Sequence, residues 1–142
     1  HSFSLPANSL EANGDWVRVS YGGVFATNNN TKRVQVTVDS QVVFNSGARD
    51  IDIGYNWKIV AEYIRVSATS IRVSGIAILG LVISGTDGAL DTGNSRWYYQ
   101  AFDGLPTVAN LNSNAVTLLV QAEGTSNDDI TQFSSIIELC QQ

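Results

Sequence analysis

The 142-residue chain has no methionine, one cysteine, and a single histidine at its first position. With Cys140 alone, no disulfide can form within the chain, which excludes a small secreted module built on disulfides. We interpret residues 1–2 as a cloning or cleavage scar and residues 3–142 as a single domain. Because no other histidine is present, the Ser-His and Cys-His dyads of hydrolases have no base. We therefore expect a protein that is not an enzyme.

Positive charge is also scarce, with 8 Lys and Arg against 13 Asp and Glu and a formal net charge of −5. The cations are scattered and form no basic stripe that could neutralise phosphates, so we expect no nucleic-acid partner. The longest apolar run has about half of the ~20 residues that a membrane-spanning helix needs. We therefore expect no insertion into a membrane.

Motifs for metals and cofactors are missing as well. No glycine-rich loop opens a helix, as a phosphate or dinucleotide site would require. Most carboxylates lie in turn clusters, where aspartate bonds its own backbone. The acidic runs at 49–52 and 127–129 could hold calcium but lack the dense spacing of an EF-hand loop. We expect no metal site and no cofactor.

Strand patterns are abundant. In the run 32–39, Val34, Val36 and Val38 alternate with polar residues, and this period of two is typical of a half-buried strand. Strand-like runs separated by turn clusters occur at 15–23, 32–39, 40–47, 56–68, 70–84, 96–102, 114–124 and 129–140. No segment has a sustained helical period. About eight strands at this spacing predict an all-β sandwich or barrel.

One strand loses its alternation in the run GIAILGLVISG (75–85). The register of the residues before it places Ala77, Leu79 and Leu81 in the core. The same register places three aliphatic side chains on the face that should meet water: Ile76, Ile78 and Val82. A bulge between Gly75 and Gly80 would exchange the two faces. We expect the three side chains to be buried between subunits, because burial of an aliphatic side chain contributes roughly 1.5–3 kcal/mol.

A long segment between 85 and 114 concentrates aromatic residues beside polar ones. Its candidate residues for binding a receptor or glycan are Trp97, Tyr98, Tyr99, Phe102, Asp91 and Asn94. Aromatic faces beside carboxylates and amides suit sugar and protein surfaces. The alternative is structural, because strand alternation would send Trp97 and Tyr99 to one side and Tyr98 to the other.

Four stretches resemble a known family: SLPANSLEANGDWVRV (4–19), GGVFATNNNTKRVQVTVDSQVVFNSGA (22–48), NWKIVAEYIRVSATSIRVSG (56–75) and NAVTLLVQAEGTSNDDITQFSSIIEL (114–139). They are similar to small β-sandwich domains of tailed-phage virion proteins, often at the tips of tail fibres and spikes. The resemblance covers most of the chain. Between Gly80 and Pro106 the sequence departs from the pattern of this family.

This resemblance implies an antiparallel, jelly-roll-like sandwich that forms a homotrimer in the virion after assembly in the host cytoplasm. It implies contacts with other virion proteins and recognition of a host cell-surface glycan or protein, and it supplies no catalytic residue. A capsid decoration or baseplate position would fit the same pattern. A secreted carbohydrate-binding module, which is also a β-sandwich, is the alternative and predicts a monomer with exposed aromatic residues.

Overall fold

The computed structural model describes residues 2–28, 30–50, 56–81 and 96–141, with the backbone alone at 49, 50, 81 and 96–98. These residues form strands and connecting turns. The strands are β1 (Ser2–Leu5), β2 (Trp16–Phe25), β3 (Thr31–Val38), β4 (Gln41–Asn45), β5 (Arg49–Asp50), β6 (Asn56–Ser67), β7 (Ser70–Leu81), β8 (Arg96–Gly104), β9 (Val116–Gly124) and β10 (Ile130–Cys140).

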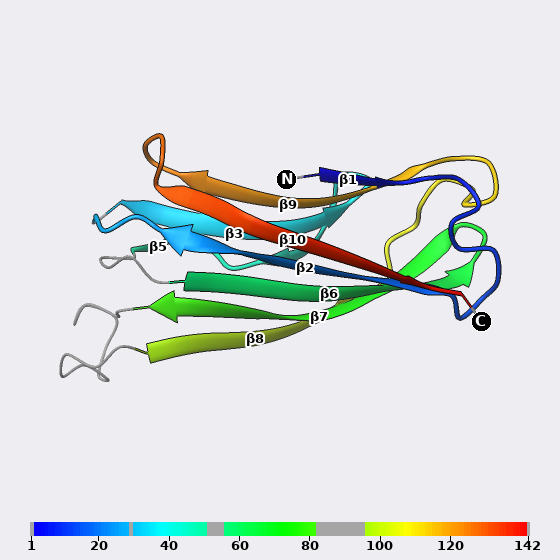
Figure 1. The fold of residues 1–142 in the computed structure, drawn as a ribbon, viewed down its shortest axis with the longest axis horizontal. Helices are drawn as coiled ribbons and strands as arrows, with labels where there is room; N and C mark the ends of the chain where they lie inside the picture. Colours follow the sequence, from blue (N-terminus) through cyan, green and yellow to red (C-terminus); the bar gives the residue numbers. More distant parts are fainter. Residues whose placement is uncertain (1, 29, 51–55, 82–95, 142) are drawn as a thin grey trace.

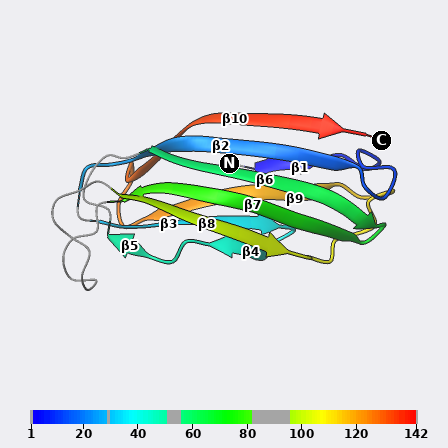
Figure 2. The same ribbon diagram turned by 90° about the horizontal axis from the view of Figure 1, so that it is seen from below.

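The strands build two antiparallel sheets. Sheet A has the order β1-β9-β3-β4, with the short β5 also paired to β3, and sheet B has the order β10-β2-β6-β7-β8. Figures 1 and 2 show the two sheets as stacked layers, with β10 and β8 at opposite edges of sheet B. The predicted all-β antiparallel sandwich is confirmed. All eight predicted strands are present, and the additional β1 and β5 have only four and two residues.

The core lies between the sheets and follows the alternation of the sequence. The residues Val34, Val36 and Val38 of β3 face inward and are fully buried, as the period of two predicts. On β2 of the opposite sheet, Val17 and Val19 belong to the same buried cluster, and the residues that alternate with them along the strand are only half-buried. Apolar contact between the two inner faces therefore holds the sandwich together.

Strand β7 keeps its register through the run that loses its alternation. Ala77 and Leu79 are buried, and the pairing with β8 continues without a shift past Gly75 and Gly80. A side chain at Gly75 would place its Cβ 2.4 Å from the Val60 carbonyl oxygen and 2.5 Å from Cζ of Phe102. Glycine at this position therefore makes room for the Phe102 ring and does not mark a bulge.

A buried polar cluster fastens two loops at one end of the sandwich. The Lys32 ammonium donates to the Asn28 carbonyl and side-chain oxygens at 3.1 and 2.7 Å and to the Asn30 carbonyl at 2.9 Å. The Asp129 carboxylate accepts from the side-chain amides of Asn30 and Asn28 at 3.0 and 2.8 Å and from the Ser126 amide at 2.7 Å. The hydrogen bonds from Asn30 and Ser126 contribute most to lowering the pKa of Asp129 to about 2.

This cluster should make stability sensitive to acid. A lowered carboxyl pKa stabilises the folded state above the unfolded pKa of about 4, and this stabilisation disappears as the pH falls through about 2. In urea titrations between pH 5 and 2, we expect the midpoint of Asp129→Asn to fall less with acidification than that of the parent chain. Asp128→Asn is the control, because the exposed Asp128 side chain lies outside the cluster. Equal acid dependence of Asp129→Asn and the parent would contradict this assignment.

Candidate functional site

The outer face of sheet B, which points away from sheet A, carries three rows of side chains across all five strands. Directly opposed residues of antiparallel strands share a face, so the pairing defines each row. The charged row is Glu138, Arg18, Glu62, Ser74 and Asp103. The apolar row is Ile136, Ser20, Val60, Ile76 and Ala101. The groove row is Ser134, Gly22, Lys58, Ile78 and Tyr99.

The charged row forms one border of this face. Arg18 lies 2.6 Å from the Glu62 carboxylate and 3.7 Å from that of Glu138, and its hydrogen bond to Glu62 raises its pKa. At the other edge, Arg72 pairs with Asp103 at 3.0 Å and lowers the pKa of that carboxyl. Exposed pairs of this kind contribute little to stability. Their main effect is to give this border a polar, charge-paired rim.

The apolar row is unusual for a sheet face that meets water. Such a face is normally polar, yet Ile136 is 60% and Ile76 38% exposed, and Ala101 is exposed beside them. Val60 continues the row on the central strand and is half-buried. The row therefore offers a nearly continuous apolar strip from β10 to β8, of the kind that marks a contact surface.

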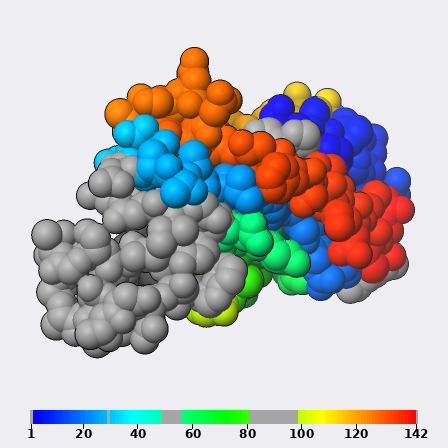
Figure 3. All heavy atoms as spheres, turned by 60° about the vertical axis from the view of Figure 1, so that its left-hand side comes forward, coloured from blue at the N-terminus to red at the C-terminus, as the bar shows by residue number. Residues whose placement is uncertain are grey.

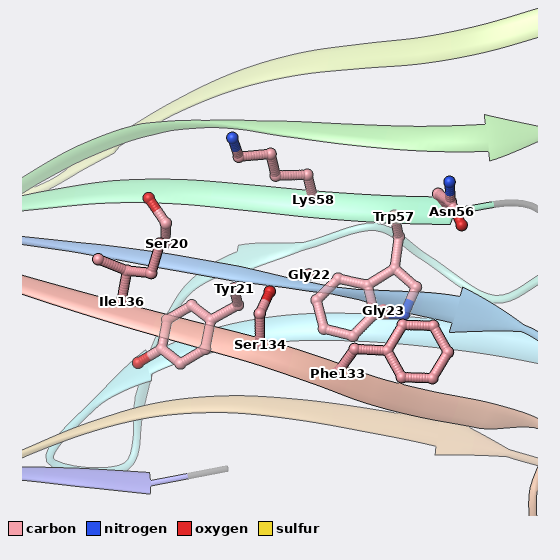
Figure 4. Close-up of a pocket in the computed structure, with 10 residues that line it drawn as sticks. All are labelled: Ser20, Tyr21, Gly22, Gly23, Asn56, Trp57, Lys58, Phe133, Ser134 and Ile136. Atoms are coloured by element: carbon pink, nitrogen blue, oxygen red, sulfur yellow. The ribbon is translucent and has the colours of Figure 1, made fainter.

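A groove of about 380 Å³ lies over Gly22, where the missing side chain leaves the backbone as its floor. Figure 4 shows the side chains around it on β10, β2 and β6. Phe133, which is 69% exposed, and Ile136 supply its apolar part, and Lys58 supplies a cation. Lys58 forms no ion pair with the described residues, whereas Arg18, Arg33 and Arg72 all do.

Strand β10 is the largest apolar feature that the sequence interpretation did not single out. Figure 3 shows its side chains as an orange-to-red strip on the surface. Ile136 is exposed on the outer face, and Ile137 and Leu139 are exposed although they share the inner face with Val19 and Val17. The signal in the sequence is the adjacent pair Ile136 and Ile137, which makes both faces of the strand apolar. As an edge strand with a single charge, β10 lacks the usual protection against association.

The structure brings several predicted residues together. Ile76 and Ile78 lie on the outer face, and Tyr99 stands directly opposite Ile78 with 61% of its surface exposed. Phe102 instead points between the sheets, where its ring stacks on Phe44 at a centroid distance of 4.9 Å. The Phe102 ring therefore packs against the core and leaves Tyr99 as the exposed aromatic candidate with a described side chain.

The other predicted residues are not placed. Trp97 and Tyr98 are residues of β8 whose backbone is described, but their side chains lie outside the described part of the chain. The remaining candidates, Val82, Asp91 and Asn94, also lie outside the described residues. The outer face of sheet B is thus defined by Ile76, Ile78 and Tyr99 together with the residues of β10, β2 and β6.

Comparison of the chain with protein-family models, curated proteins and solved structures gave no match. Within residues 2–28, 30–50, 56–81 and 96–141, no three His, Cys, Asp or Glu side chains gather where they could hold a metal ion. The same ranges contain no helix long and apolar enough to span a membrane. The chemistry that the outer face offers is apolar contact, the Lys58 ammonium with no ion pair in the described part of the chain, and a shallow groove.

Proposed function

We propose that this domain is a non-enzymatic structural part of a tailed-phage virion and associates as a homotrimer through the outer face of sheet B. The observation that carries the proposal is the apolar row, which places an apolar side chain on four of the five strands, with Ser20 on β2, on a face that would otherwise meet water. The resemblance of four stretches to virion domains supplies the setting. It favours the tip of a tail fibre or spike, in contact with other virion proteins and with a host cell-surface glycan or protein.

The composition of the outer face supports association. Aliphatic side chains such as Ile76 and Ile136 each gain roughly 1.5–3 kcal/mol when they are fully buried. The charged row lies on one side of the apolar row and Lys58 on the other. An apolar centre with a polar rim is the usual anatomy of a stable protein interface.

Light scattering on the full chain tests this proposal. We expect a three-chain mass at micromolar concentration and at least ~30-fold weaker association for Ile76→Lys, because the change buries a charge at the centre of the contact. Val42→Lys is the control, since Val42 is exposed on β4 of the other sheet and its replacement should leave the mass unchanged. Circular dichroism and thermal unfolding show that each variant is folded. A monomeric parent chain would contradict the proposal.

A secreted carbohydrate-binding module is the second candidate function. The groove over Gly22 favours it, because the exposed Phe133 ring beside polar side chains suits a sugar. This candidate requires a monomer in the same light-scattering measurement and glycan binding that depends on Phe133. A trimer without glycan binding would exclude it.

A further inference from the structure

Two features of the outer face lie near opposite edges of sheet B. Tyr99 projects from the edge strand β8, and the groove over Gly22 lies among β10, β2 and β6. Both belong to the groove row, in which two strand spacings of about 4.8 Å separate Tyr99 from Lys58 and three separate it from Gly22 within one chain. Because the distance of about 14 Å to Gly22 exceeds the reach of the side chain, Tyr99 cannot enter the groove of its own chain.

The groove suits a tyrosine ring in size and chemistry. Its volume of about 380 Å³ leaves room for a phenol over the bare backbone of Gly22. Phe133 and Ile136 offer apolar contact to the ring, and aromatic pairs gain energy beyond the area they bury. Lys58, which has no ion pair among the described residues, lines the groove. Its ammonium lies on the β7 side of β6 in Figure 4, and a turn of the flexible side chain would let it donate a hydrogen bond to a tyrosine hydroxyl. Tyrosine prefers sites with one apolar and one polar end.

We infer that Tyr99 of one copy docks in the groove over Gly22 of the next copy. The contact joins two different patches, so it is heterologous, and each copy gives one tyrosine and accepts one. A heterologous contact closes into a ring when the rotation between copies allows it, and the number three rests on the proposed function. Ile78, which lies between Tyr99 and Lys58 in the groove row, would be covered by the same contact.

Two variants remove the two halves of the contact separately. Tyr99→Ser removes the ring and leaves the groove. Gly22→Val fills the groove and leaves the ring, and a Cβ at Gly22 has only the movable Ser134 hydroxyl within 3.2 Å. A β-branched residue also suits an open strand face. Should Gly22→Val fail to fold, Ser134→Tyr fills the same groove from its exposed wall. Leu105→Ser, at an exposed loop residue outside both patches, is the control.

We expect each variant alone to be monomeric at ten times the concentration at which the parent chain is half trimeric. An equimolar mixture of Tyr99→Ser and Gly22→Val should form a two-chain species, because the tyrosine of one variant meets the open groove of the other. If either single variant still forms a trimer, or if the mixture stays monomeric, the Tyr99 contact is wrong and the proposed function is unaffected. A monomeric parent chain would overturn both the Tyr99 contact and the proposed homotrimer. The contact is supported if Leu105→Ser remains trimeric while Tyr99→Ser and Gly22→Val are each monomeric.

Discussion

Gly23→Ala is expected to lower the free energy of unfolding by roughly 3 kcal/mol or more, the range of severe overpacking in a core. A Cβ at this position would lie 1.9 Å from the Thr131 carbonyl oxygen and 2.8 Å from Cε2 and Cζ2 of the Trp57 ring. Neither neighbour can move easily. Thr131 belongs to the pairing of β10 with β2, and the buried Trp57 ring packs against Phe25 at a centroid distance of 6.4 Å.

The adjacent glycine provides a matched control for this experiment. A Cβ at Gly22 would meet only the Ser134 hydroxyl at 3.2 Å and the Trp57 carbonyl at 3.6 Å. Gly22→Ala should therefore change the free energy of unfolding by less than about 1 kcal/mol, since alanine also restricts the unfolded chain. Urea titrations followed by circular dichroism compare the two variants. Similar midpoints for both would show that the sheet yields at Gly23, contrary to this expectation.

The strands could be predicted because their signal is local. The alternating valines at 34, 36 and 38 predict a buried face from a run of only eight residues, and all three are buried in the structure. The inward placement of Ala77 and Leu79 followed from the same local period. The short β1 and β5 carry too few residues for a period of two to show. They form because neighbouring strands offer them partners.

The candidate surface could be predicted only in part. Ile76 and Ile78 stood out in their own strand, but the apolar row joins Ile76 to Ile136 and Val60, which come from distant segments. The register that aligns these residues depends on pairing between strands, and no single segment of sequence contains that information. The inward turn of Phe102 depends in the same way on the space that Gly75 leaves on the neighbouring strand.

Lys32 is a charged residue that is buried on the core face of β3. It shares the parity of Val34 and Val36, so alternation places its ammonium on the core face of β3. The structure buries it to 1% exposure and surrounds it with the oxygens of Asn28 and Asn30. A buried cation is tolerated only when oxygens and charges replace its water.

Lys32→Ala should therefore lower the free energy of unfolding by about 3 kcal/mol, as expected when one member of a buried charged network is removed. The change leaves the oxygens of Asn28 and Asn30 without their ammonium donor and Asp129 without a nearby cation. Arg33→Ala is the matched control, since Arg33 lies on the exposed side of β3 in a surface pair with Glu123. It should cost less than about 1 kcal/mol.

Lys32→Met separates the two possible sources of this effect. Methionine keeps most of the apolar stem and fills the same space, but it has no ammonium group. If hydrogen bonding and charge dominate, Lys32→Met should lose most of what Lys32→Ala loses in a urea titration. It should also unfold first in the loops that carry Asn30 and Asp129, which hydrogen exchange of the Ser126 amide would detect. A Lys32→Met variant as stable as the parent would mean that packing of the stem, and not the polar cluster, holds this end of the sandwich.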